Sequence, residues 1–540
     1  MKNRLTRAAL ACAALCTAPW ALAHDATATA TDGALGVVHF QVGCKHEAQH
    51  EFDLAMAYYH SFAWDQIKAP LDRVLQADPA CGMVHWVRAL ASLDIPFIWP
   101  GPVSAKVLAD GAALMDAARK AGLSTERERD YVDALGVFFQ DVDKLNHRTR
   151  AKALETALEK VAAKYPADTE AKILHSLVLT ANFDPADKQY SNQLRAATQL
   201  EPIFVKQPQH PGVAHYLIHS YDYPPLAARG LSAATRYNKI APAAAHAQHM
   251  PSHIFTRVGA WNESVAANAA SAKADSPTSF STPHAFDYMT YAHLQMGQDR
   301  AAQAARDSAF AIAIAKRIDH FAAAYAYAAM PARLALERGD WAAAAKMPLT
   351  PAADAYPWAK YPQAEASNAY ARALGSAAKR DAAGVEAELA RLQGLRDKAT
   401  ELKLGYWVEQ ISIQIDVVRG LASFKVGHAD AGLAALRTAA DREDASEKSA
   451  VTPGPLLPAR EMYAAALLEV GDGAGALREF EAVLVKEPKR LRAIAGAALA
   501  AERVGNAQKA RDYDLQVARQ TAQADAGMSG IQLARLSVTR

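Results

Sequence analysis

The 540-residue sequence has few cysteines, no excess of charge of either sign and no familiar catalytic motif. With 59 Lys and Arg against 57 Asp and Glu, it lacks the basic surplus that contacts with a nucleic-acid backbone require, so nucleic-acid binding is not expected. We find no Gly-rich phosphate loop, no G-x-S-x-G serine motif and no H-E-x-x-H zinc motif. Beyond the N-terminus no apolar run approaches the roughly 18 residues of a membrane span. Whether the chain is an enzyme therefore stays open.

The four cysteines and the N-terminus point to one compartment. Lys2, Arg4 and Arg7 precede an apolar run, and Ala21-Leu22-Ala23 forms an A-x-A cleavage site, so residues 1–23 read as a secretory signal peptide. We expect an exported, periplasmic protein with no membrane span. Two cysteines remain after cleavage, Cys44 and Cys81, which form a disulfide or stay as buried thiols. The Ala- and Thr-rich residues 24–36 are expected to be disordered.

From residue 37 onward the apolar residues recur at spacings of three and four, which predicts an all-α chain of paired helices. Thr125 and Glu128 have the spacing of a capping box that opens a helix. A Pro-rich stretch at 347–362 is expected to separate an N-terminal block, 37–346, from C-terminal repeats, 363–540.

The pairing of helices has a sequence signature near the C-terminus. A turn glycine, Gly471, is followed by Ala476, Phe480 and a closing Pro488, and related patterns recur along most of residues 46–520. These spacings resemble the tetratricopeptide repeat (TPR), a helix-pair unit of about 34 residues. The resemblance implies a right-handed superhelical solenoid of antiparallel helix pairs, whose concave groove holds a protein, peptide or small ligand. The run 246–259 is also similar to exported bacterial TPR proteins of uncharacterised role.

Histidines are concentrated in the middle of the chain, where eight of the 18 fall between residues 210 and 293. His215 and His219 are four residues apart, and so are His249 and His253, one repeat length later. An i,i+4 pair shares one face of a helix, so the two pairs occupy equivalent faces of neighbouring repeats. Imidazole is a good ligand for Zn, Cu, Fe and Ni, so these four residues are the predicted metal ligands.

The offset of each residue from its turn glycine extends this row along the predicted groove. The same positions hold further candidates for metal or ligand binding: His175, His246, His284, Asp287, Tyr291 and Arg257. Pro251 follows Met250 within the cluster and requires the helix to kink or restart there.

Three hypotheses on function follow. The chain is a binding or scaffold protein whose groove takes a metal ion or a small or peptide ligand, a copper- or zinc-handling protein, or a metal-dependent hydrolase or oxidase built on the same histidines. A row of buried, mutually hydrogen-bonded histidines that only stabilises the fold is the competing interpretation.

Overall fold

The computed structural model describes residues 34–94, 103–276, 279–527 and 529–539. The signal peptide predicted at 1–23 and most of the predicted tail at 24–36 lie outside these residues. Regular secondary structure in the described parts of the chain is helical, which confirms the predicted all-α class. The helices of the N-terminal part are α1 (His46–His60), α2 (Lys68–Ala77), α3 (Met83–Ala91), α4 (Ala105–Ala121), α5 (Glu126–Gly136), α6 (His147–Lys164), α7 (Thr169–Ala181), α8 (Ser191–Lys206), α9 (Pro211–Tyr221), α10 (Leu231–Ile240), α11 (Ala245–His249), α12 (Pro251–Arg257) and α13 (Trp261–Ala274).

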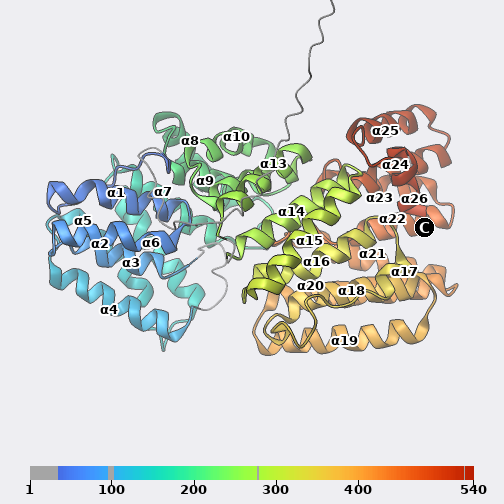
Figure 1. The fold of residues 1–540 in the computed structure, drawn as a ribbon, viewed down its shortest axis with the longest axis horizontal. Coiled ribbons are helices and arrows are strands. Elements are labelled where there is room, and N and C mark those ends of the chain that lie inside the picture. Colours follow the sequence, from blue (N-terminus) through green and yellow to red (C-terminus); the bar gives the residue numbers. More distant parts are fainter. Residues whose placement is uncertain (1–33, 95–102, 277–278, 528, 540) are drawn as a thin grey trace, which may run out of the picture.

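The chain continues with a second series of helices. They are α14 (Ser281–Gln295), α15 (Asp299–Lys316), α16 (Phe321–Leu336), α17 (Trp341–Ala345), α18 (Pro362–Ala378), α19 (Ala382–Glu401), α20 (Gly405–Lys425), α21 (Ala429–Ala445), α22 (Ala459–Glu469), α23 (Gly473–Lys486), α24 (Leu491–Arg503), α25 (Ala507–Gln520) and α26 (Gly530–Thr539). Each helix packs chiefly against its neighbours in sequence, as in a TPR-like solenoid (Figure 1).

Short polar signals begin and end these helices as the sequence predicts. The Thr125 hydroxyl accepts the Glu128 backbone N–H while the Glu128 carboxylate accepts the Thr125 N–H, so the predicted capping box is present. Gly259 ends the α12 region with a φ of +66° and lies so close to Lys489 that a Cβ atom there would be 2.7 Å from the lysine Cβ. A glycine is therefore required both by the turn and by the approach of a distant repeat.

Two large hydrophobic cores divide the molecule. The first gathers buried side chains from Leu35 to Ala267, and the second gathers those from Ala309 to Ala466. The Pro-rich stretch 347–362 does not separate them, because Tyr356 and Trp358 are buried within the second core. The physical reason is that these aromatic rings fill the space beside α16 and α18, so the prolines shape a packed loop and not a linker.

The end of the predicted tail is also packed. Leu35 is buried in the first core, and the Ala34 carbonyl accepts a hydrogen bond from the Ala243 N–H. Cys44 and Cys81 form a disulfide with a Cα–Cα distance of 5.2 Å.

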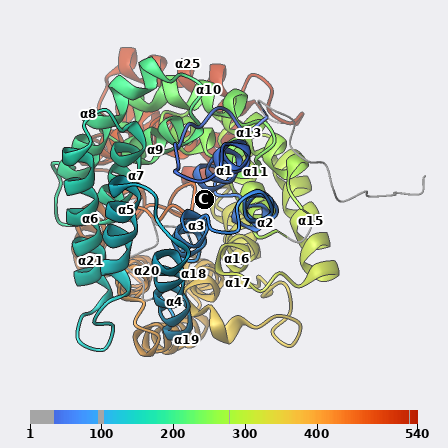
Figure 2. The ribbon, with the colours of Figure 1, turned by 90° about the vertical axis from the view of Figure 1, so that its left-hand side faces the viewer.

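The C-terminal repeats return to the middle of the chain. The Leu491 N–H donates to Gln295 Oε1 at 2.9 Å, and the Asp525 N–H donates to the Gly297 carbonyl at 3.1 Å. Viewed along the long axis, the helices surround the middle of the molecule (Figure 2). These contacts place the C-terminal repeats against α14 and the turn after it, directly beyond the histidine-rich segment.

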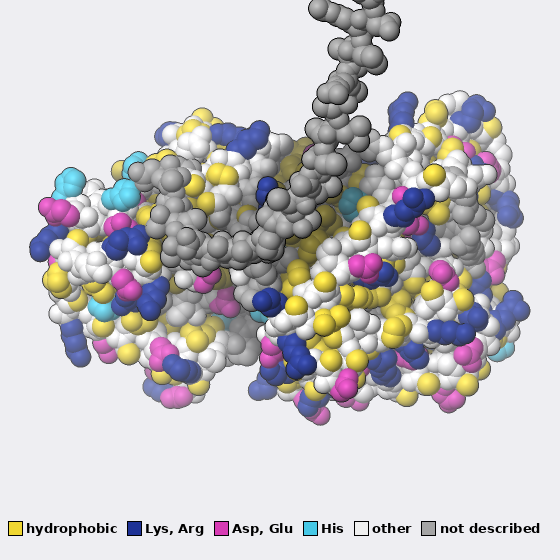
Figure 3. Space-filling model, viewed as in Figure 1, with side chains coloured by type: hydrophobic (Ala, Val, Ile, Leu, Met, Phe, Trp, Pro, Cys, Tyr) yellow, Lys and Arg dark blue, Asp and Glu magenta, His cyan; other side chains and the backbone are white. Residues whose placement is uncertain are grey.

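The outer surface carries mixed charge. Acidic and basic side chains are interspersed over the face drawn in Figure 3, in agreement with the nearly balanced composition. Among the helices of the described residues, we find none with the length and apolar character needed to cross a membrane.

Candidate metal centre

The central histidines project from four helices of three consecutive repeats. His215 and His219 lie on α9, and His246 and His249 lie on α11. The predicted break occurs at Met250, so that α12 starts at Pro251 and carries His253. His284 comes from α14 in the next repeat. The helices group these side chains into trio A (His215, His219 and His246) and trio B (His249, His253 and His284), each with ring nitrogens within 4.8 Å of one another.

Trio A converges on a single nitrogen atom. The Nε2 atoms of His219 and His246 both lie 3.1 Å from His215 Nε2. His215 Nδ1 lies 2.7 Å from the His60 carbonyl, which can only accept, so Nδ1 carries the proton and Nε2 presents its lone pair. One lone pair thus faces two neighbouring nitrogens, an arrangement that a single cation between the three rings satisfies.

Trio B contains a sharper conflict between two nitrogens. His253 Nδ1 lies 2.9 Å from the Asp222 carboxylate, and His249 Nδ1 lies 2.6 Å from Asn268 Oδ1. The Asn268 amide nitrogen donates to the Ser264 carbonyl, which fixes the amide orientation. Both Nδ1 atoms therefore donate, and both Nε2 atoms carry lone pairs. These two Nε2 atoms are 3.0 Å apart, so neutral rings place lone pair against lone pair.

Neither trio takes up protons readily. Burial, reinforced by neighbouring imidazoles, lowers the pKa of His215, His219, His246, His249 and His284 well below the usual 6.5, and burial also lowers that of His253. The third member of trio B, His284, has an Nδ1 atom that is buried and makes no hydrogen bond within the described structure. The rings are thus held neutral, with nitrogen lone pairs available to a metal ion.

The two trios are adjacent to one another. The ring centres of His219 and His253 are 6.2 Å apart, and those of His246 and His249 are 6.3 Å apart. Aromatic side chains surround them, with Phe62 against all three rings of trio A and Tyr288 against all three rings of trio B. The six imidazoles form one continuous cluster.

The buried carboxylate of Asp222 orients the His253 ring of trio B by accepting a hydrogen bond from its Nδ1 atom. Besides accepting from His253, Asp222 accepts from Arg257 Nε at 2.8 Å and lies 3.6 Å from Lys448 Nζ. Burial alone would raise the pKa of Asp222, but the charges of Lys448 and Arg257 and the His253 hydrogen bond outweigh it and hold the pKa well below 3.8. Asp222 is therefore ionised and fixes the tautomer of His253, a common role for a carboxylate behind a metal-binding histidine.

Lys448, which lies near Asp222, belongs to a loop more than 200 residues beyond it in the sequence. The loop 446–458, between α21 and α22, contacts the segment between α7 and α8 through Glu447, whose carboxylate lies 2.9 Å from Lys188 Nζ. The Tyr288 hydroxyl donates to the loop carbonyl of Ala450 at 3.2 Å. This loop therefore covers trio B.

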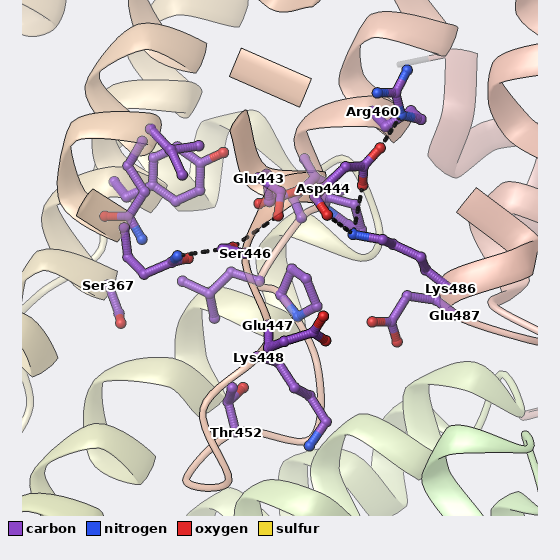
Figure 4. A pocket seen from close by; sticks show the side chains of 18 of the residues that line it. Ser367, Glu443, Asp444, Ser446, Glu447, Lys448, Thr452, Arg460, Lys486 and Glu487 are labelled. Carbon is purple, nitrogen blue, oxygen red and sulfur yellow. Dashed lines mark hydrogen bonds and ion pairs between the residues drawn. The ribbon is translucent and has the colours of Figure 1, made fainter. Parts of the chain in front are cut away.

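A cavity of about 100 Å³ lies beside the loop and is lined by Tyr325, Trp407, Glu443, Lys448, Glu487 and Arg257, among others. In Figure 4 Lys448 extends away from Glu443 toward the helices of the green segment. Burial raises the pKa of Glu443 to about 7 and lowers that of Lys448 to about 8. Because Arg257 and Lys448 both contact Asp222, the wall of the cavity is also the support of trio B.

A third buried group differs from the trios in its hydrogen bonds. His60 and His210 each donate from Nε2 to Glu170, at 3.1 and 2.7 Å. Their Nδ1 atoms accept, that of His60 from the Tyr216 hydroxyl and that of His210 from the Val213 N–H. All four ring nitrogens have complementary partners, so this group is satisfied without a metal ion.

Several predicted site residues lie elsewhere. The row is not an open groove, because His215, His249 and His253 are at most 3% exposed beneath the returning loop and repeats. His175 faces α8, where its Nδ1 lies 3.2 Å from Gln199 Oε1. Asp287 is paired with Arg333 Nε at 2.8 Å.

The remaining two candidates belong to buried charge networks. The Tyr291 hydroxyl accepts from Arg490 at 3.3 Å, and Arg257 binds Asp222. Asp287 and Tyr291 therefore bind arginines from other segments of the chain and do not belong to the predicted site. Arg257 contacts the site only through Asp222, which binds His253.

Sequence reasoning missed four contributors, namely Asn268, Lys448, Phe62 and Tyr288. Tyr288 lies four residues after His284, a spacing that places both on one face of α14 and could have been noticed. The other three come from other elements, and no local pattern marks them.

Comparisons with known proteins find likeness in structure only. No protein-family model matches the chain, and no curated protein sequence matches it. Among solved structures, the human IFIT1 dimer with m7Gppp-AAAA has a TM-score of 0.35 at 11% identity, covering 82% of this chain and 89% of IFIT1. Yeast Tom70 has a TM-score of 0.25 at 12% identity, covering 91% of this chain and 89% of Tom70. Similarity this low carries no argument about ligands or partners, so function rests on the site itself.

Proposed function

We propose that this protein binds two transition-metal ions, one in trio A and one in trio B, within an exported helical-repeat scaffold. The observation that carries the proposal is the 3.0 Å contact between the Nε2 atoms of His249 and His253. The partner of each Nδ1 atom can only accept a hydrogen bond, so each Nδ1 atom carries the proton and both Nε2 atoms are acceptors. A proton or a metal ion between them removes the repulsion, and the lowered pKa values disfavour the proton.

The composition of the site supports the same reading. Imidazole nitrogens suit zinc, copper, iron and nickel, and three protein ligands leave a coordination position for a further ligand. The hydrogen bonds that His215, His249 and His253 make from Nδ1 are those by which proteins orient metal-binding histidines. The His60–Glu170–His210 group, whose nitrogens are all satisfied, is assigned a structural role.

Export to the periplasm is part of the proposal and rests on the N-terminal sequence. The disulfide between Cys44 and Cys81 agrees with an oxidising compartment.

Metal analysis of the purified mature protein tests the proposal. Loading under metal-replete conditions followed by removal of unbound ions should leave about two ions per chain, as three imidazoles suffice for each. His249→Ala and His215→Ala should each lose about one ion. His175→Ala is the matched control, because this buried histidine lies outside both trios, and it should retain both ions. A wild-type protein that retains no metal would overturn the proposal.

A second candidate function is suggested by Lys448. Its ammonium group is buried beside the cavity and makes no hydrogen bond within the described structure, although it lies 3.6 Å from Asp222. A small carboxylate that enters the cavity would supply the missing acceptor. Acetate should then raise the melting temperature of the wild type and leave that of Lys448→Met unchanged. An equal rise in both proteins would exclude this role for Lys448.

A further inference from the structure

Within the described residues, both trios lack a negatively charged ligand. Each consists of three imidazoles, and neither includes a carboxylate or a thiolate. The carboxylate closest in the hydrogen-bond network, Asp222, is already paired with Arg257 and faces Lys448. An ion bound in either trio therefore brings positive charge that the protein does not neutralise.

Resting on the proposed metal binding, we infer that the cluster is a two-ion centre selective for copper in the monovalent state. The cost of burying an ion grows with the square of its charge, so a divalent ion is penalised about four times as heavily as a monovalent one. His215, His249 and His253 are buried, and aromatic rings pack on the cluster. Copper(I) binds three imidazoles while adding a single charge.

The proximity of the trios strengthens the preference. Rings of opposite trios lie 6.2 and 6.3 Å apart, so the ions that they bind are near neighbours. Repulsion between two divalent ions is about fourfold that between two monovalent ions at equal separation. Zinc is the main competitor, and two zinc ions here would require an added anion, such as hydroxide, to offset their charge.

The nearby cations act in the same direction. Lys448 and Arg257 lie behind His253 with Asp222 between them, and Lys448 adds repulsion that also reaches His249 and His284. The surroundings of trio B therefore oppose further positive charge. They favour the reduced copper ion over copper(II) as well as over zinc.

Competition between metals tests this selectivity. The metal-free protein is incubated without oxygen with excess copper(I) and excess zinc together, unbound ions are removed, and bound metal is measured by mass spectrometry. We expect about two copper ions per chain with copper exceeding zinc by roughly tenfold or more, because each zinc ion adds a buried charge that the residues around it do not neutralise. The X-ray absorption edge of the bound copper should be that of copper(I), and it should persist after exposure to air.

An isosteric variant tests the charge argument directly. Asn268→Asp keeps an oxygen acceptor for His249 Nδ1 and adds a buried negative charge behind trio B. We expect this variant to retain several times more zinc than the wild type and to oxidise in air more readily. Ser252→Ala is the control, since Ser252 Oγ contacts the same Asn268 oxygen at 3.5 Å without bearing charge.

The outcomes separate the two proposals. Two zinc ions in the wild type, or copper that appears as copper(II), would overturn the selectivity for copper(I) while leaving metal binding intact. No metal of either kind would overturn both. Equal metal selectivity in the wild type and Asn268→Asp would show that buried charge does not decide which ion is bound.

Discussion

Replacing Asp222 tests whether this carboxylate orients a metal-binding histidine or only forms an ion pair that stabilises the fold. In Asp222→Asn the side chain keeps its shape but loses its charge, while Arg257 and Lys448 remain with side chains 4% and 6% exposed. The amide also presents a weaker acceptor, or a donor, to His253 Nδ1. Two properties should therefore change together, namely the stability of the fold and the affinity of trio B for metal.

The magnitudes follow from the buried position of each partner. Removing one member of a buried ion pair costs about 3–5 kcal/mol, because the remaining charge is left without a counterion. Loss of the acceptor behind a metal-bound histidine typically costs 10–100-fold in affinity, which corresponds to about 1.4–2.7 kcal/mol. Trio A has no direct contact with Asp222 and should keep its affinity.

Two measurements and one paired variant test this reasoning. Urea unfolding of the metal-free protein gives the stability, and titration against a chelator of known affinity gives metal binding. In Lys448→Met the Asp222–Arg257 pair survives, so metal affinity should rise or stay unchanged. The double variant should recover part of the stability lost in Asp222→Asn. Metal affinity that stays within about twofold of the wild type in Asp222→Asn would refute the orienting role.

The other predictions concern pH, the disulfide, the loop and the third histidine group. In the metal-free protein the six trio histidines have lowered pKa values, so the unfolded chain takes up protons that the folded chain refuses. The free energy of unfolding should therefore fall as pH drops through 6.5, the usual pKa of histidine. The expected loss is about 1.4 kcal/mol for each histidine that stays neutral, between about pH 7.5 and about pH 5.5. Urea unfolding measures it, and a stability that does not change with pH would contradict the burial of these rings. Reduction of the Cys44–Cys81 disulfide, which joins residues 37 apart, should cost up to about 4 kcal/mol, seen as a lower melting temperature of the wild type in reductant than without it. The Cys44→Ala/Cys81→Ala double variant, which lacks the disulfide, should melt at the same temperature in both conditions, and a wild type that is equally insensitive to reductant would contradict a stabilising disulfide. Glu447→Ala should release metal to a chelator faster in stopped-flow mixing, since it frees the loop from Lys188, and an unchanged rate would mean that the loop does not limit release. His210→Ala should lower stability without changing metal stoichiometry, and loss of an ion would reassign that group.

Much of the fold could be predicted because its signals are local. The capping box at Thr125, the restart of the helix at Pro251 and the turn at Gly259 each depend on a few neighbouring residues. The i,i+4 pairs of histidines, repeated one helix pair later, likewise predicted that His215, His219, His249 and His253 would lie in one region, although the structure divides them between trio A and trio B. Repeat proteins favour such reasoning, since every unit packs on its neighbours in sequence.

The rest of the site depends on contacts between distant residues, and no local pattern encodes them. Asp287 shares the predicted row with His284, but Arg333, 46 residues away in sequence, pairs with it. Lys448 lies more than 200 residues beyond Asp222 and reaches it because the C-terminal repeats return to the middle of the chain. The expectation of an open groove failed for the same reason, since helical periodicity carries no information about which distant loop covers a face.

The returning loop has a consequence for how metal binding and folding are connected. Trio B is built from residues 249–284 near the middle of the chain, while Lys448 and the carbonyl that binds Tyr288 belong to a loop whose Leu456 and Leu457 are buried in the second core. An ion in trio B repels Lys448 and is covered by that loop, so its entry requires the loop to move and its presence weakens one of the loop's contacts. By linkage, the position of the loop and the occupancy of trio B must influence each other to the same extent. The loop can therefore respond to metal in trio B through a direct contact, because Asp222 binds His253 of trio B and also lies 3.6 Å from Lys448 of the loop.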